Sequence, residues 1–98
     1  MTAERSSRIR ERLIATLEPS ELIVADESDR HVGHPGARDG RGHFRVHLVS
    51  RHFHGQARLR RHRLVYEALD DMMKTDIHAL SIEALTPEEA KGPDASTA

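Results

Sequence analysis

The spacing of apolar residues predicts two amphipathic helices, at residues 6–17 and 57–74. In the first segment apolar residues recur at helical spacing, at Ile9, Leu13, Ile14 and Leu17. Pro19 ends this helix, because the residue before a proline avoids helical dihedral angles. The second segment has a longer apolar stripe, formed by Leu59, His62, Val65, Tyr66, Leu69, Met72 and Met73. Each helix therefore has one face suited to a core.

Three shorter segments predict β-strands, at residues 21–27, 43–50 and 76–85. The second strand alternates between two faces, with Phe44, Val46 and Leu48 on one and His43, Arg45 and His47 on the other. The apolar face of such a strand packs against the core, so we expect the two sets to be buried and exposed respectively.

Turn-forming residues separate these elements. Glycine and proline interrupt residues 29–42, which we expect to form a loop, and residues 51–56 form a turn. Thr86 and Glu89 have the spacing of a capping box, with Pro87 at the first helical position. A short last helix is therefore expected after the third strand.

The order of elements is helix, strand, strand, helix, strand, helix. This order predicts a two-layer α+β domain over residues 1–90, with a three-stranded sheet and the helices on one face. Residues 91–98 are predicted to form a disordered tail.

The amino-acid composition indicates the cellular compartment and limits the metal ligands that the chain can supply. The chain has 98 residues, 37% of them apolar, and no cysteine, so it can supply neither a disulfide nor a thiolate ligand. Its N-terminal segment has no apolar run long enough for a signal peptide or a membrane span. We therefore expect a single-domain cytoplasmic protein with no membrane partner.

The charge is segregated, although the net charge is only −1. Residues 30–63 contain nine arginines and one acidic residue, whereas residues 66–98 contain eight acidic residues and two lysines. A basic central region favours an anionic partner. If that partner is DNA, the expected phosphate contacts lie at the basic start of the second helix, at Arg58, Arg60, Arg61 and Arg63.

Histidine is the most informative residue type in this chain. Of the eight histidines, seven lie between His31 and His62. The eighth, His78, has the register of Leu80 and Ile82 at the open end of the third strand. Neutral imidazole binds Zn, Fe, Cu and Ni, but none of the familiar zinc-site spacings is present. Two of these histidines would therefore form only part of a metal site that a partner completes.

The sequence contains no catalytic constellation. It lacks the G-x-S-x-G pattern of a nucleophile elbow. Its paired carboxylates, Asp70 with Asp71 and Glu88 with Glu89, are adjacent along predicted helices, where neighbouring side chains diverge. We therefore expect a protein that is not an enzyme.

Several short motifs follow one another in order over residues 8–90. They are VADES after the first strand, HFRV at the end of the loop, LVS, F-x-G in the turn, RHRLVY at the start of the second helix and HAL in the third strand. In these motifs the chain closely resembles the BolA family. The resemblance implies the class II KH-like fold, whose order of elements agrees with the order predicted above.

The resemblance also implies a partner and a cofactor. The partner is a monothiol glutaredoxin with bound glutathione, and the two proteins share a [2Fe-2S] cluster that serves cluster trafficking, maturation or iron regulation. Thiols of the glutaredoxin and of glutathione hold one iron, and the BolA-like protein holds the other. The HAL motif maps the strand ligand onto His78. The loop ligand maps onto His31, with His34 as the alternative, and His43 and His47 stay surface residues.

Two alternatives to this hypothesis stay open. One is a DNA-binding transcriptional regulator, and the other is a homodimeric interaction module with no metal.

The cluster hypothesis predicts that the chain alone holds no cluster, because two imidazoles cannot supply the four ligands that a [2Fe-2S] cluster requires.

Overall fold

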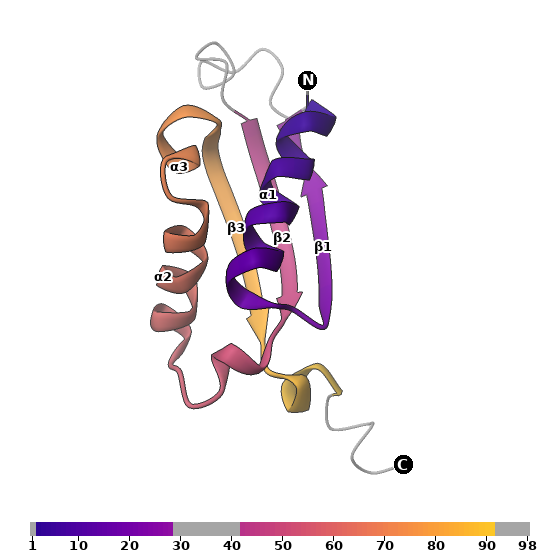
Figure 1. Cartoon of the computed structure of the whole chain (residues 1–98), viewed down its shortest axis with the longest axis vertical. Coiled ribbons are helices and arrows are strands. Elements are labelled where there is room, and N and C mark those ends of the chain that lie inside the picture. Colours follow the sequence, from indigo (N-terminus) through magenta and orange to yellow (C-terminus); the bar gives the residue numbers. More distant parts are fainter. Residues whose placement is uncertain (1, 29–41, 92–98) are drawn as a thin grey trace.

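A three-stranded sheet with helices on one face forms the structure (Figure 1). This computed structural model describes residues 2–28 and 42–91. The elements are α1 (Thr2–Leu17), β1 (Glu21–Asp26), β2 (Gly42–Val49), the 3-10 helix η3 (Arg51–Phe53), α2 (Arg58–Leu69), α3 (Met72–Thr75) and β3 (Ile77–Leu85). A short helix at 87–91 follows β3. The predicted α+β class, with a three-stranded sheet, is confirmed.

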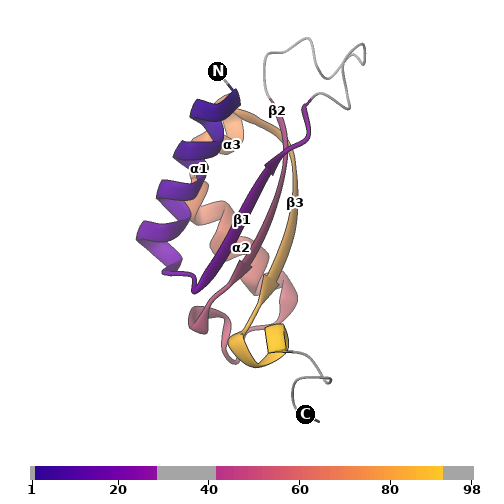
Figure 2. The same ribbon diagram turned by 90° about the vertical axis from the view of Figure 1, so that its right-hand side faces the viewer.

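The strands lie in the order β1-β2-β3. β1 pairs antiparallel with β2, and β2 pairs parallel with β3. A parallel pair needs a long crossover, which α2 and α3 provide. Figure 2 shows α1, α2 and α3 on the same side of the sheet, so the other face is left without a helix. That uncovered face carries Ile23, Arg45 and Glu83, all exposed.

The core lies between the sheet and the helices. It contains Ile9, Leu13 and Leu17 from α1, Phe44, Val46 and Leu48 from β2, Phe53, Val65, Ala68, Leu69 and Met72 from the crossover, and Ile77 and Ala84 from β3. The burial predicted for the apolar face of β2 is therefore confirmed, whereas on its other face Arg45 is exposed and His43 and His47 are partly buried. Complete burial of one large aliphatic or aromatic side chain contributes about 1.5–3 kcal/mol to folding, so this apolar core holds the two layers together.

The helix predicted at 57–74 is divided in two, and that part of the prediction was wrong. Asp70 has a φ of 49° and its N–H donates to the carbonyl oxygen of Tyr66 at 2.8 Å. The chain therefore leaves α2 at Leu69 and re-enters a helix at Met72. Two members of the predicted apolar stripe do not join the core, because Leu59 is 65% exposed and Tyr66 is 40% exposed. Periodicity alone does not reveal a break of this kind, because the apolar spacing continues through it.

The capping box predicted after β3 is present, but the start of α1 and the end of the last helix differ from the predicted boundaries. In this capping box the N–H of Thr86 donates to Oε1 of Glu89 at 2.9 Å, and the N–H of Glu89 donates to Oγ1 of Thr86 at 3.2 Å. α1 begins at Thr2, four residues before its predicted start. Lys91 lies in the last helix, and the rest of the predicted tail, 92–98, lies outside the described residues. No helix in the described ranges has the length and apolarity to cross a membrane.

Candidate metal centre

Two histidines lie side by side where β2 and β3 begin. The ring centroids of His43 and His78 are 5.1 Å apart, with the rings tilted by 53°. The pairing of the two strands shifts at this point, since Gly42 pairs with Ile77 whereas His43 pairs with Ala79. His78 is therefore the extra residue of a β-bulge in β3. Bulges commonly redirect a side chain near a functional site.

The bulge changes the direction predicted for His78. Uninterrupted alternation from Leu80 and Ile82 would place His78 toward the helices and Ile77 away from them. Instead Ile77 is 1% exposed and belongs to the core, whereas His78 is exposed. The register predicted for β3 was therefore wrong at His78. Because of the bulge, the imidazole of His78 lies on the surface at the start of β3.

Hydrogen bonds fix the backbone around His43. Its N–H donates to Oγ of Ser28 at 3.1 Å, and its carbonyl oxygen accepts from the N–H of Glu27 at 2.8 Å. A Cβ on Gly42 would lie 2.7 Å from the Phe44 ring and 2.7 Å from Oγ of Ser28, so only glycine fits there without displacement. The two described residues that flank 29–41, Ser28 and Gly42, thus lie next to the histidine pair.

Asp76 connects this end of the sheet to α1. Its carbonyl oxygen accepts from the N–H of Gly42 at 2.9 Å. Its carboxylate accepts from Oγ1 of Thr75 at 2.6 Å and from Nη1 of Arg8 at 3.0 Å, and Nε of Arg5 lies 3.4 Å away. The Thr75 hydrogen bond, followed by the charges of Arg8 and Arg5, holds the pKa of Asp76 below its ordinary value. This buried carboxylate fixes the residue two positions before His78.

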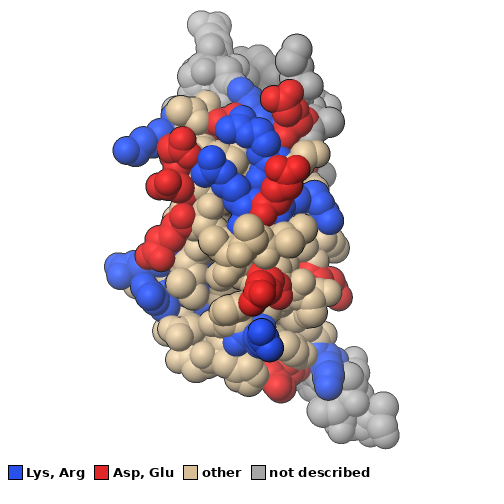
Figure 3. All heavy atoms as spheres, in the orientation of Figure 1, with Lys and Arg blue, Asp and Glu red and all other residues tan. Residues whose placement is uncertain are grey.

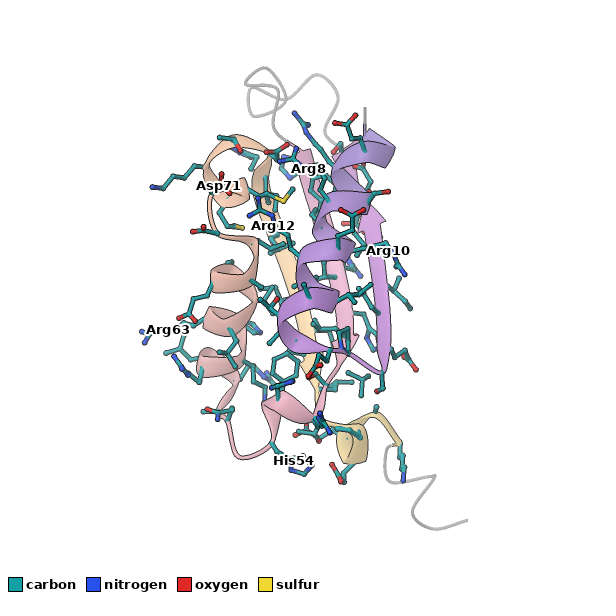
Figure 4. All side chains as sticks on the ribbon, in the orientation of Figure 1. Arg8, Arg10, Arg12, His54, Arg63 and Asp71 are labelled. Atoms are coloured by element: carbon teal, nitrogen blue, oxygen red, sulfur yellow. The ribbon has the colours of Figure 1, made fainter. Side chains whose placement is uncertain are left out.

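The arginines of α1 belong to the same network (Figure 4). Arg8 and Arg12 extend from α1 toward the segment around α3. Nη1 of Arg12 donates to Oδ1 of Asp71 at 2.9 Å and to the carbonyl oxygen of Leu69 at 2.8 Å. Figure 3 shows basic and acidic side chains intermixed over this part of the surface. The charges here therefore hold elements together rather than forming a uniformly basic patch.

The predicted loop ligands, His31 and His34, lie outside the described residues. Within 2–28 and 42–91, no group of three or more His, Asp or Glu side chains is arranged to hold a metal ion. Imidazole is a suitable ligand for iron or zinc, so the described donors fit part of a metal centre. His78 stays the predicted strand ligand.

Three further histidines each pair with glutamate. His47 Nδ1 lies 2.7 Å from Oε1 of Glu83, and its Nε2 lies 3.0 Å from Oε1 of Glu21. His52 pairs with Glu18 at 3.1 Å and His54 with Glu88 at 2.9 Å. The carboxylates around His47 bind opposite ring nitrogens, so one ion cannot bridge all three groups. These contacts are structural links between elements.

The basic start of α2 divides into one partly buried arginine and three exposed ones. Arg61 donates to the carbonyl oxygens of Gln56 and Ala84 at 2.8 and 3.0 Å, and to Oε1 of Glu89 at 2.6 Å. The Arg61 hydrogen bond also lowers the pKa of Glu89 to about 2. Arg58, Arg60 and Arg63 are exposed, and Figure 4 shows Arg63 directed away from the molecule. Arg61 therefore holds α2 to the last helix and is poorly placed for phosphate.

Sequence reasoning missed the proximity of His43 to His78. It placed His43 on the outer face of β2, which is correct, but it assigned His78 to the opposite face. One signal was present in the sequence, because strict alternation would have exposed apolar Ile77 and turned polar His78 inward. A polarity mismatch of this kind at a strand end indicates a bulge.

The chain belongs to the BolA family. The family model for BolA-like protein matches residues 13–89, which include α2, α3 and the whole sheet. Proteins of this family are not enzymes, which confirms the prediction made from the sequence.

Individual relatives show the same similarity. "Protein BOLA1, chloroplastic" of Arabidopsis thaliana is 45% identical over 93 residues, which cover 92% of this chain and 58% of that protein. "DNA-binding transcriptional regulator BolA" of Escherichia coli (strain K12) is 41% identical over 85 residues, covering 87% and 78%. The solved BolA domain of SufE1 from Arabidopsis thaliana has a TM-score of 0.77 at 47% identity, covering 87% of this chain and 94% of that chain.

The lengths of these relatives differ from the length of this chain. The chain spans 58% of Arabidopsis BOLA1 and 24% of the Arabidopsis protein named SufE-like protein 1. The similarity therefore concerns the BolA domain and not the whole length of these relatives.

Proposed function

We propose that this BolA-like protein binds a monothiol glutaredoxin with glutathione and shares a [2Fe-2S] cluster with it. The observation that carries the proposal is His78, an exposed imidazole at the bulged start of β3, in a family member that has no cysteine. Histidine replaces cysteine on one iron in Rieske centres, so an imidazole suits the iron that this chain would hold. The thiolates must come from the partner.

The second ligand in this proposal is His31, with His34 as the alternative. Support comes from the anchoring of Ser28 and Gly42 beside the histidine pair, because the chain between them starts and ends near His78. We further propose that the complex acts in cluster trafficking, maturation or iron regulation. A cytoplasmic location is part of the proposal, although the Arabidopsis relative is named chloroplastic.

Mixing with a cluster-loaded monothiol glutaredoxin tests the proposal. We expect a new visible circular dichroism spectrum at a 1:1 ratio, lost in His78→Ala and kept in His54→Ala, an exposed imidazole at the opposite end of the molecule (Figure 4). His31→Ala should weaken the spectrum more than His34→Ala. If His78→Ala retains the wild-type spectrum, His78 is not a ligand and the proposed centre is misplaced.

A second candidate function is DNA binding. It is favoured by the name of the Escherichia coli relative and by the exposed Arg58, Arg60 and Arg63 at the start of α2. Arginine contacts to phosphate release counterions, so affinity should fall steeply with salt. Replacing these three arginines with glutamine should flatten the salt dependence. Absence of binding at low salt, or a slope that the triple variant leaves unchanged, would exclude this surface.

A further inference from the structure

We propose that His43 and His78 form a chelating pair that binds one divalent transition-metal cation, such as Zn²⁺, without any partner protein. The proposal shares His78 with the function proposed above but needs neither glutaredoxin nor iron. It rests on the two strands that bring these imidazoles together, and it gives a role to His43, which the cluster hypothesis leaves as a surface residue.

The spacing of the two rings suits a shared ion. Imidazole nitrogens bind zinc at about 2.0–2.1 Å with tetrahedral angles, which places the centroids of two coordinating rings about 5 Å apart. The centroids of His43 and His78 are 5.1 Å apart. Binding then requires that rotation of the rings about their side-chain bonds direct one nitrogen of each toward a common ion.

The pair is held by the fold on both sides. The backbone of His43 is hydrogen-bonded to Ser28 and Glu27, and its Nε2 atom is buried, so part of its ring is enclosed by the fold. His78 lies between buried Ile77 and the paired residue Ala79. A ligand pair fixed in advance loses less conformational entropy when it binds an ion.

The surroundings determine which ions are suitable. Two neutral imidazoles and no thiolate favour borderline cations such as Zn²⁺, Ni²⁺ and Cu²⁺ over hard cations such as Mg²⁺. The remaining coordination positions stay open to water or to another ligand, as the fourth position does in catalytic zinc sites. An ion on this pair would occupy His78, so it would compete with the cluster for the same imidazole.

Zn²⁺ titration of the partner-free protein tests the proposal. Isothermal calorimetry should report one site, and long-range ¹H–¹⁵N spectra should show the imidazole nitrogens of His43 and His78 shifting together. His43→Gln and His78→Gln should each weaken Zn²⁺ binding at least tenfold, while His54→Ala, His31→Ala and His34→Ala should stay within about twofold of the wild-type affinity. Circular dichroism checks that each variant is folded.

Three results would overturn the proposal. They are wild-type affinity in His43→Gln, a loss of binding in His31→Ala or His34→Ala comparable to that in His78→Gln, and wild-type spectra in which the ring signals of His43 do not move. The cluster proposal is tested separately with glutaredoxin. Loss of Zn²⁺ binding in His43→Gln with retention of the mixed cluster would support the present inference and leave His31 as the cluster ligand.

Discussion

At the scale of single residues, His47 links all three strands across the face of the sheet that the helices leave uncovered. It lies on β2, between Glu83 of β3 and Glu21 of β1. The hydrogen bond to Glu83, supported by the one to Glu21, raises the pKa of His47 above its ordinary 6.5, against the opposing effect of partial burial. Protonated His47 therefore ties both edge strands to the central one.

This raised pKa predicts a pH-dependent stability. A group with a higher pKa in the folded state stabilises the fold fully below its unfolded pKa of about 6.5, and the contribution is lost as the pH rises through the folded pKa. We expect the free energy of unfolding, measured in urea, to fall as the pH rises from about 6.5 through the folded-state pKa of His47. His47→Gln and Glu83→Gln should each make this fall smaller. If both variants keep the pH dependence of the wild type, the contacts of His47 with the two glutamates do not contribute to the pH dependence of stability.

Gly42 is the second residue whose substitution has a defined result. Gly42→Ala would place a methyl group 2.7 Å from both the Phe44 ring and the Ser28 hydroxyl. Overpacking of this kind costs about 1–3 kcal/mol, which a shift in the urea midpoint measures. Gly55→Asn is a suitable control, because Gly55 has a φ of 72° with no atom near its absent Cβ and asparagine tolerates positive φ. Equal stability of Gly42→Ala and wild type would contradict the close packing.

At the scale of elements, Asp70 determines where α2 ends. Its φ of 49° and ψ of −121° lie in a region that glycine adopts more easily than any residue with a Cβ. We expect Asp70→Gly to stabilise the protein by about 1 kcal/mol, seen as a higher thermal midpoint. Lys74→Gly, in α3, should instead destabilise it by about 1 kcal/mol. Destabilisation by both substitutions would mean that Asp70 is not strained.

Local sequence patterns predicted most of the elements. The alternation of Phe44, Val46 and Leu48, the Thr86–Glu89 capping box and the stop at Pro19 all depend on neighbouring residues, so the sequence reveals them. The break at Asp70 depends instead on how α3 packs against β3 and on the bonds of Arg12 to Leu69 and Asp71. A helical period continues through such a break, which is why the prediction failed there.

At the scale of the whole molecule, only part of the candidate centre could be predicted. The motif HAL predicted His78 as a ligand, which stays a prediction, and the family was recognised from motifs that span most of the chain. The polarity of Ile77 and His78 indicates the bulge, but the proximity of His43 could not be predicted, because it also depends on the parallel pairing of β2 with β3. Arg61 was predicted as a phosphate contact, but its bonds to Ala84 and Glu89 arise only when the last helix packs.

In the proposed complex, the imidazole of His78 binds iron in a cluster shared with glutaredoxin. The most direct measurement is pulsed electron paramagnetic resonance of the reduced complex, with ¹⁵N-histidine in this protein alone. We predict strong ¹⁵N couplings from directly coordinated imidazole, as expected for histidine-ligated [2Fe-2S] centres, and loss of one coupling or of the whole cluster in His78→Gln. A reduced cluster without any strong ¹⁵N coupling, or with couplings that His78→Gln leaves unchanged, would contradict the claim.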